Sequence, residues 1–380
     1  MKTKKLIRTF LIVLAVAAGS IALAACDNSF GVFHEIQTEK AQVGTDVFKN
    51  VTVKAIAEDG SNYYAAMAKV FYRPTGGDTW LVLPVNSDTD YYCSGLASTG
   101  AGTIYVAATD TSTTALKGIF STSDSGANWN KMSDAEFDGK IVDALFYVNG
   151  TLFATSHTDT ESSDTFYLYY WDTATSNFLP ATFPSALDIP ITGLVYGGSA
   201  YWAMTSSALY TSSASPFNFV ADSTSGTPSS AKTLCGIATD SSADVLVTTS
   251  DGYLYTYAAS AWSSDLLASS VKLGVLAEVP IDDAASAYRL LVAKHNSSYG
   301  YYEYNAATQD DPLSGNDGDA IFSPTASSYT TTIYLKPVMA FHYSTANKTL
   351  LIGMAAQGTD TYALYSNTVT GSDWSGWTAE

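Results

Sequence analysis

Short apolar stretches, separated by turn residues, run along the chain from about residue 50 onwards and repeat one pattern. An apolar residue, a variable residue, a small residue and Leu or Ile stand in a row. Seven copies occur, the last of them looser: Val53–Ile56, Cys93–Leu96, Val142–Leu145, Ile191–Leu194, Leu234–Ile237, Leu273–Leu276 and Pro337–Ala340. Beyond residue 25 we find no convincing 3.6-residue periodicity, so the pattern predicts strands rather than helices.

Each copy continues with further strands of distinct character. The second strand is aliphatic, as in Gly102–Ala108 and Lys348–Met354. The third is rich in aromatics: Val70–Arg73, Gly118–Thr122, Phe166–Trp171, Ala208–Ser212, Gly252–Tyr257, Tyr299–Tyr304 and Tyr362–Ser366. An aromatic opens a weak fourth strand at Trp80, Trp129, Phe178, Phe217, Trp262 and Trp377. The sixth copy departs, because an acidic insert (Asp310–Asp319) precedes its candidate last strand at Ile321-Phe322.

Seven repeats of four strands are the signature of a β-propeller, in which each repeat forms one blade of a ring. Small residues in the first strand suit a crowded axis, and aromatics fill the wedge-shaped gaps between blades. A β-sandwich or two stacked barrels would also show alternating strands, but neither explains the fixed order of strand types. We therefore expect an all-β fold over residues 47–380, a propeller of seven blades of four antiparallel strands, with six or eight blades as the alternatives.

The first 25 residues have the composition of an export signal. Met1–Arg8 carries four basic residues and no acid, an apolar stretch follows, and Leu23-Ala24-Ala25-Cys26 ends it. This ending resembles the lipobox of bacterial lipoproteins, whose small residues admit the signal peptidase and whose Cys is acylated; an ordinary secretory signal or an uncleaved anchor helix is the alternative. The resemblance implies that residues 1–25 are removed and that Cys26 carries a diacylglycerol or acyl lipid. Residues 26–46 would form a flexible stalk, in which Val32–Ile36 is a candidate strand for closing the ring.

Charge narrows the possible partners. Removing residues 1–25 lowers Lys plus Arg from 18 to 14 against 36 Asp plus Glu, so the formal charge goes from −18 to −22. Such a chain lacks the cations that displace phosphate counterions, which excludes nucleic acid and leaves the lipid as the expected membrane contact. The lipobox implies an extracytoplasmic protein of the bacterial cell envelope, and Asp27 does not decide between inner and outer membrane. We interpret Cys93 and Cys235 as buried small hydrophobes rather than a disulfide.

One turn carries a recognisable motif. The segment Thr122–Trp129 (TSDSGANW) resembles the Asp-box, or BNR repeat, with the pattern Ser/Thr-x-Asp-x-Gly-x-x-Trp, and Arg73–Trp80 is a degraded copy. Asp124 can accept backbone N–H groups within the turn, Gly126 supplies positive φ, and Trp129 starts the fourth strand. In that family the box is a folding element at the blade periphery, which implies that Thr122, Asp124, Gly126 and Trp129 are structural.

Sialidases also carry Asp-boxes, but their chemistry needs three arginines around the substrate carboxylate. Beyond residue 25 the chain holds two, Arg73 and Arg289, so sialidase activity is rejected. Other glycosidases need two carboxylates across a cleft. Asp143 is the best single candidate, because the second place of a first strand can face the axis, although a solvated structural acid is the simpler interpretation.

Metal sites have little support in the sequence. His157 and His295 fall on blades expected to lie across the ring, too far apart to share an ion. A weak calcium candidate lies in the acidic insert at Asp311, Asn316, Asp317 and Asp319, which lacks the spacing and closing Glu of a known calcium loop. We expect no cofactor otherwise.

Three functions remain. The first is a non-catalytic lipoprotein, a monomer whose propeller binds an envelope partner or serves as an assembly scaffold, as in the photosystem assembly factors that Asp-box propellers resemble. The second is a polysaccharide-binding surface protein, motivated by the abundant Tyr and Trp. The third is a glycoside hydrolase-like enzyme with its site at the axis. Exposed aromatics on one rim would favour the second, and converging carboxylates the third.

Overall fold

A computed structural model shows the fold, and its description covers most of the chain beyond residue 46. It describes residues 47–109, 117–132, 135–158, 164–228, 230–280, 288–295, 300–305, 336–356, 362–370, 373–374 and 376–380. Cys26, the candidate closing strand and the candidate calcium residues lie outside these ranges. In the part that is described, no helix has both the length and the apolar character needed to span a bilayer.

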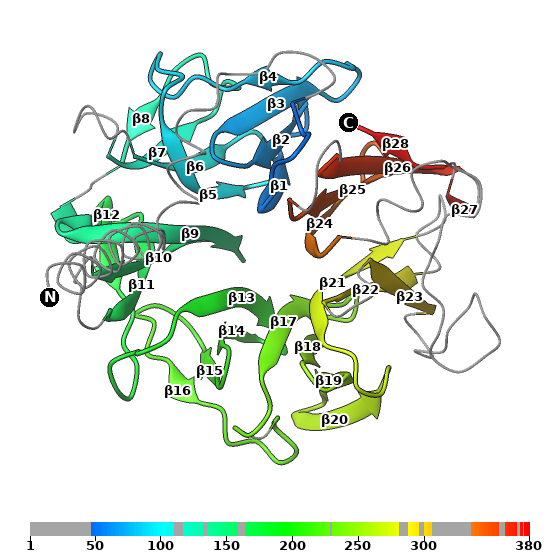
Figure 1. The fold of residues 1–380 in the computed structure, drawn as a ribbon. Helices are drawn as coiled ribbons and strands as arrows, with labels where there is room; N and C mark the ends of the chain where they lie inside the picture. Colours follow the sequence, from blue (N-terminus) through cyan, green and yellow to red (C-terminus); the bar gives the residue numbers. More distant parts are fainter. Residues whose placement is uncertain are drawn as a thin grey trace, which may run out of the picture. The chain divides into compact units, whose positions relative to one another are not determined.

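Seven antiparallel sheets follow one another along the chain, and we number them as blades 1 to 7 (Figure 1). Blade 1 has β1 (Ala55–Glu58), β2 (Asn62–Ala66), β3 (Val70–Pro74) and β4 (Leu81–Val82). Blade 2 has β5 (Tyr92–Ser98), β6 (Ile104–Thr109), β7 (Gly118–Thr122) and β8 (Asn130–Lys131). Blade 3 has β9 (Lys140–Val148), β10 (Thr151–Thr158), β11 (Phe166–Asp172) and β12 (Asn177–Pro180). Blade 4 has β13 (Ile191–Gly197), β14 (Ala200–Thr205), β15 (Leu209–Ser212) and β16 (Val220–Ala221).

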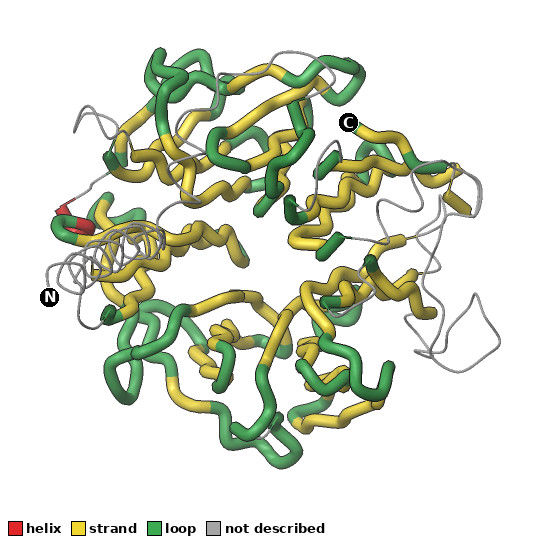
Figure 2. The backbone as a smooth tube through the Cα atoms, viewed as in Figure 1, coloured by secondary structure: helices red, strands yellow, loops and turns green. Residues whose placement is uncertain are grey.

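The remaining blades complete the series. Blade 5 has β17 (Leu234–Thr239), β18 (Val245–Thr249), β19 (Tyr253–Ala258) and β20 (Ala261–Leu266). Blade 6 has three described strands, β21 (Leu273–Pro280), β22 (Tyr288–Lys294) and β23 (Tyr301–Asn305). Blade 7 has β24 (Val338–Ser344), β25 (Thr349–Met354), β26 (Leu364–Thr370), β27 (Asp373–Trp374) and β28 (Thr378–Ala379). Figure 2 shows strand and loop almost throughout, with one 3-10 turn, η2 (Ala135–Phe137), among the described residues.

The first strands of the blades form the inner wall of the ring. Each packs against the first strand of the next blade, in the order β1, β5, β9, β13, β17, β21 and β24, and β24 packs against β1. The chain is therefore a seven-bladed β-propeller of antiparallel blades, as the repeats predict. The predicted start of the seventh repeat is off by one residue, because Val338 rather than Pro337 pairs with the end of the second strand, at Met354.

Aromatic side chains fill the gaps between blades. Phe153 of blade 3 packs edge-on against Phe217 of blade 4, with ring centroids 4.9 Å apart. Trp202 of blade 4 meets Trp262 of blade 5 at 5.4 Å. Because blades diverge outward from the axis, large rings fill volume that aliphatic side chains would leave empty.

The ring closes where blade 7 meets blade 1. The residues before β1 lie against blade 7, where Ala363 N donates to Phe48 O at 2.8 Å and Val53 N donates to Met354 O at 3.0 Å. Glu380, after β28, reaches blade 1: its Oε2 accepts a hydrogen bond from Trp80 Nε1 at 2.9 Å and lies 3.1 Å from Arg73 Nη1.

Small residues in the first strands are required by the spacing of neighbouring inner strands. A Cβ placed on Gly236 would lie 2.4 Å from the carbonyl oxygen of Gly274 in the next blade. A Cβ on Gly95 would lie 2.9 Å from the backbone nitrogen of Leu145. Backbone cannot move aside as a flexible side chain can, so any larger residue pushes two blades apart.

We predict that Gly236→Ala lowers the free energy of unfolding by about 1–3 kcal/mol through overpacking. Gly76→Ala is the matched control, because a Cβ there would meet nothing within 4 Å. Urea denaturation of the two variants measures the difference, and equal midpoints would contradict the close approach of blades 5 and 6.

Candidate functional site

The strand directions define two faces of the ring. First strands begin, and second strands end, on what we call the front face. The connections from second to third strands and from each fourth strand to the next blade therefore lie on the front face. The other connections lie on the back face.

A β-bulge interrupts the pairing of first and second strands near the front face in six of the seven blades. The shifts fall between Cys93 and Gly95, Val142 and Ala144, Ile191 and Gly193, Leu234 and Gly236, Leu273 and Leu276, and Val338 and Ala340. A bulge leaves one residue unpaired and re-aims its side chain. In most blades the unpaired residue is the variable second place of the repeat.

These second places form a ring that we call the mouth ring: Lys54, Ser94, Asp143, Thr192, Cys235, Gly274 and Met339. The preceding apolar residue is buried in most blades, as at Val53 and Leu234, whereas Lys54 and Thr192 are exposed and Cys235 is half-buried. Because both faces of each sheet pack against neighbouring blades, an exposed side chain on an innermost strand faces the axis. Gly274 has no side chain, and the ring of His295 lies within 2.7 Å of where its Cβ would be.

The acidic member of the mouth ring, Asp143, forms a carboxylate–imidazole pair with His157. His157, on the second strand of blade 3, places Nδ1 2.7 Å from Asp143 Oδ1. Asp143 Oδ2 is buried and has no hydrogen-bond partner among the described residues. Burial raises the pKa of the Asp143 carboxyl above its ordinary value, and the hydrogen bond and charge of His157 oppose that rise. The sequence interpretation of Asp143 as a solvated acid is thus only partly right, since the side chain is half-buried and paired.

Cations lie elsewhere around the mouth. Lys54 Nζ lies 3.5 Å from the hydroxyl of Tyr92, whose pKa is raised to about 12 by burial, with Cys93 and Asp143 adding to the shift. Lys272 is exposed immediately before blade 6. Burial lowers the pKa of His295, whose Nε2 lies 2.9 Å from Val338 O, and the charge of Lys272 lowers it further. The mouth is therefore positive towards blades 1 and 6 and negative towards blade 3.

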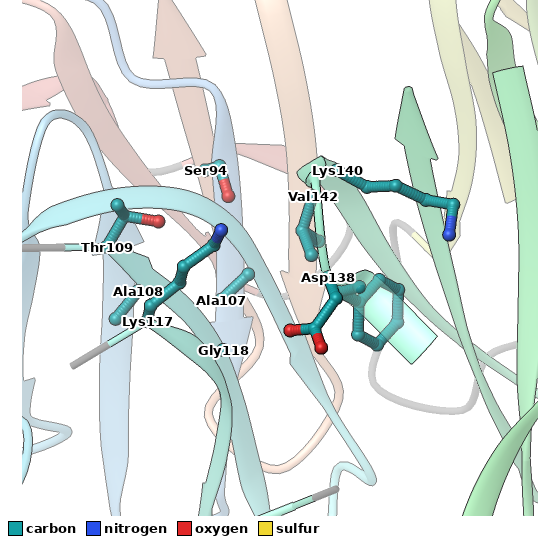
Figure 3. Close-up of a pocket in the computed structure, with 10 residues that line it drawn as sticks. Ser94, Ala107, Ala108, Thr109, Lys117, Gly118, Asp138, Lys140 and Val142 are labelled. Carbon is teal, nitrogen blue, oxygen red and sulfur yellow. The ribbon is translucent and has the colours of Figure 1, made fainter. Parts of the chain in front are cut away.

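A small cavity adjoins the mouth ring on the front face, between blades 2 and 3 (Figure 3). Its volume is about 30 Å³, which is room for about two waters. The ring residue Ser94 lines it together with Ala107, Val142 and Gly118. Figure 3 shows Lys117 and Asp138 on either side of the space, while the amine of Lys140 points away, where it donates to Glu136 O at 2.9 Å.

The Asp-box-like turn lies on the back face, away from the mouth ring. Asp124 Oδ1 accepts hydrogen bonds from Asn128 N and from Thr122 Oγ1, both at 2.8 Å. Gly126 has φ of 92°, and Trp129 Nε1 donates to Pro84 O of the blade 1–2 connection at 2.9 Å. These contacts hold the turn closed and tie it to the neighbouring blade; that the turn belongs to the Asp-box family stays a prediction.

The remaining candidates do not gather into a second site. Arg73 is held by Glu380, and Arg289 pairs with the buried Glu303 in blade 6. Both described cysteines are free, Cys93 buried as expected and Cys235 half-buried at the mouth, which corrects its interpretation as a core residue. The described residues hold no group of three or more possible metal ligands.

Aromatic side chains do not form a sugar-stacking platform in the described part of the chain. Among the residues whose side chains the structure describes, every aromatic is buried or half-buried. The exposed large hydrophobic residues there are aliphatic: Leu81, Ile141, Val220 and Leu266. The abundant Tyr and Trp are used between blades.

The bulges and the Asp143–His157 pair were not predicted from the sequence. Periodicity identifies which residues belong to a strand, but a one-residue bulge leaves that pattern almost unchanged. The signal that could have revealed the bulges is the variability of the second place within an otherwise uniform repeat, since a position that packed would carry one residue type.

Comparison with known proteins supports the fold. No family model matches the chain, and no curated protein matches it. Among solved structures, "YCF48 bound to D1 peptide" is similar with a TM-score of 0.55 and 12% identity, covering 85% of this chain and 93% of that one. The WD40 propeller domain of Doa1 has a TM-score of 0.52 at 9% identity, covering 89% and 100%. The designed protein Ika8 has a TM-score of 0.52 at 10% identity, covering 90% of each chain. At these identities the likeness establishes the propeller fold alone.

We predict opposite pH dependence for two acids on the inner strands. The raised pKa of Asp143 means that its charge destabilises the fold as pH rises above the ordinary Asp value of about 3.9. Asp143→Asn should therefore gain stability relative to wild type on going from about pH 3 to pH 7.

Glu58 is the control, because burial would raise its pKa but the neighbouring His342 and Ser344 outweigh this and lower it. Glu58→Gln should lose stability relative to wild type over the same interval, since the lowered pKa stabilises the fold only while the acid is ionised. Denaturant unfolding at each pH measures both, and the same sign for the two variants would contradict the assignment.

Proposed function

We propose that this chain is a non-catalytic, lipid-anchored propeller of the bacterial cell envelope whose front face binds a polypeptide segment of an envelope partner. The observation that carries the proposal is the row of bulges in six of the seven blades, which directs a variable set of side chains, Ser94, Asp143 and Thr192 among them, into the mouth ring of an otherwise regular scaffold. Bulges are retained at functional sites because they interrupt the ladder, and a purely structural ring would have no use for seven different residues there.

Two further observations favour a polypeptide ligand. One similar propeller is described as bound to a peptide, which supports the proposal by analogy of fold. No described aromatic side chain is fully exposed, which disfavours sugar stacking. As expected from the sequence, we propose that the protein acts as a monomer and without a cofactor.

The test is capture of partners from a detergent-solubilised envelope with two matched variants. Thr192→Arg places a bulky charge in the mouth ring, and Thr345→Arg places the same change on an exposed back-face loop. Quantitative mass spectrometry should show that Thr192→Arg reduces capture of the main partner at least tenfold while Thr345→Arg retains it. Equal capture by the two variants would rule out the front face as the binding surface.

The membrane anchor has its own prediction. Cys26→Ser removes the thiol that would be acylated, so the protein should move from the membrane fraction to the soluble extracytoplasmic fraction. Fractionation with detergent phase partitioning measures this, with Cys235→Ser as the control that leaves the lipobox intact. Unchanged partitioning of Cys26→Ser would refute lipidation.

A further inference from the structure

The Asp143 side chain is 31% exposed at the mouth ring. The bulge between Val142 and Ala144 turns the residue out of the ladder, and His157 holds Oδ1 at 2.7 Å. Oδ2 is buried and has no hydrogen-bond partner within the described residues. The carboxylate is therefore only partly compensated by hydrogen bonds, and a cation bound against its exposed part would be stabilised.

The charges around Asp143 select the kind of donor. The charges of His157 and Asp164 act on the pKa of Asp143, which in turn raises that of Tyr92. The Lys54 amine, on blade 1, points to the Tyr92 hydroxyl. Lys140 lies on the same strand as Asp143, but its amine donates to Glu136 O. The described ion pair of Asp143 is with His157 and not with a lysine or arginine, and a cationic donor forms a stronger bond to a carboxylate than a neutral one.

We propose that Asp143 receives a lysine or arginine side chain of the bound polypeptide segment, whose N–H groups contact the exposed part of the carboxylate. This inference rests on the proposed function, since it assigns one contact of the segment that the front face binds. The net charge of −22 expected after removal of residues 1–25 steers a basic segment towards the protein.

The polarity of the mouth also orients the segment. Its basic residue lies at blade 3, and neighbouring acidic or carbonyl groups lie towards Lys54 and Lys272 on blades 1 and 6. A segment docked in the reverse sense would set a carboxylate against Asp143 and a cation against the lysines, which is unfavourable on both sides.

The experiment uses small probes and the purified full chain in detergent. Nα-acetyl-arginine amide and Nα-acetyl-lysine amide are titrated against the uncharged analogues Nα-acetyl-citrulline amide and Nα-acetyl-norleucine amide. The imidazole resonances of His157 report occupancy of the site. The cationic probes should bind about tenfold more tightly than the neutral ones, and Asp143→Asn should remove that preference.

Glu58→Gln is the control, because Glu58 is an inner-strand acid whose Oε2 lies 3.8 Å from His342 Nε2, at the back-face end of the ring. It should leave the cation preference unchanged. Equal affinity for arginine and citrulline probes, or an undiminished preference in Asp143→Asn, would overturn the inference. The unfolding midpoint of Asp143→Asn shows that the variant is folded when it is tested.

Partner capture separates this inference from the proposed function. If Thr192→Arg abolishes capture but Asp143→Asn leaves it intact, the front face binds the partner without this contact and the inference fails alone. If the probes bind at Asp143 while Thr192→Arg captures the partner normally, the proposed function fails and the cation site stands.

Discussion

The close approach of neighbouring inner strands is the constraint on which this structure depends. Seven strands can surround one axis only if some positions carry no side chain, and Gly236 shows how little room remains beside the carbonyl of Gly274. The same crowding explains why aromatics lie farther out: the space between blades opens with distance from the axis, and Phe153, Phe217 and Trp202 fill it. Small inner residues and large outer ones are two responses to a single wedge-shaped geometry.

Ring closure needs additional contacts, because blade 7 and blade 1 are at opposite ends of the propeller sequence and must be joined to each other. Backbone hydrogen bonds join Phe48 to Ala363 and Val53 to Met354, and the Glu380 carboxylate is held between Trp80 and Arg73. Arg73 therefore has a structural role at the seam. Breaking one partner of such a buried pair typically costs about 3–5 kcal/mol, so seam residues are poor places to look for a ligand site and the mouth ring is a better one.

The repeats were sufficient to predict the blade count, the strand order and the aromatic filling, because each depends on periodicity and residue size. The sequence did not predict strand register or β-bulges, because each depends on the position of a single residue. Val338, not Pro337, starts the pairing of blade 7, and the turning of Asp143 towards His157 depends on a bulge that the alternation of apolar residues does not encode. Contacts between blades, such as Trp129 with Pro84, join residues far apart in sequence and cannot be derived from one repeat.

The outermost strands of blades 1, 2 and 4 are two residues long, and so are β27 and β28 of blade 7. Exposed strand edges are where β-proteins join one another laterally, and an edge this short offers few unpaired backbone groups. If the proposed lipid anchor displays the chain at high density on a membrane, copies confined to that surface would collide rim to rim. At the blades with such short outer strands, neighbouring copies would make contact without pairing into a continuous sheet. The outer strand of blade 5, β20, is six residues long and is the exception.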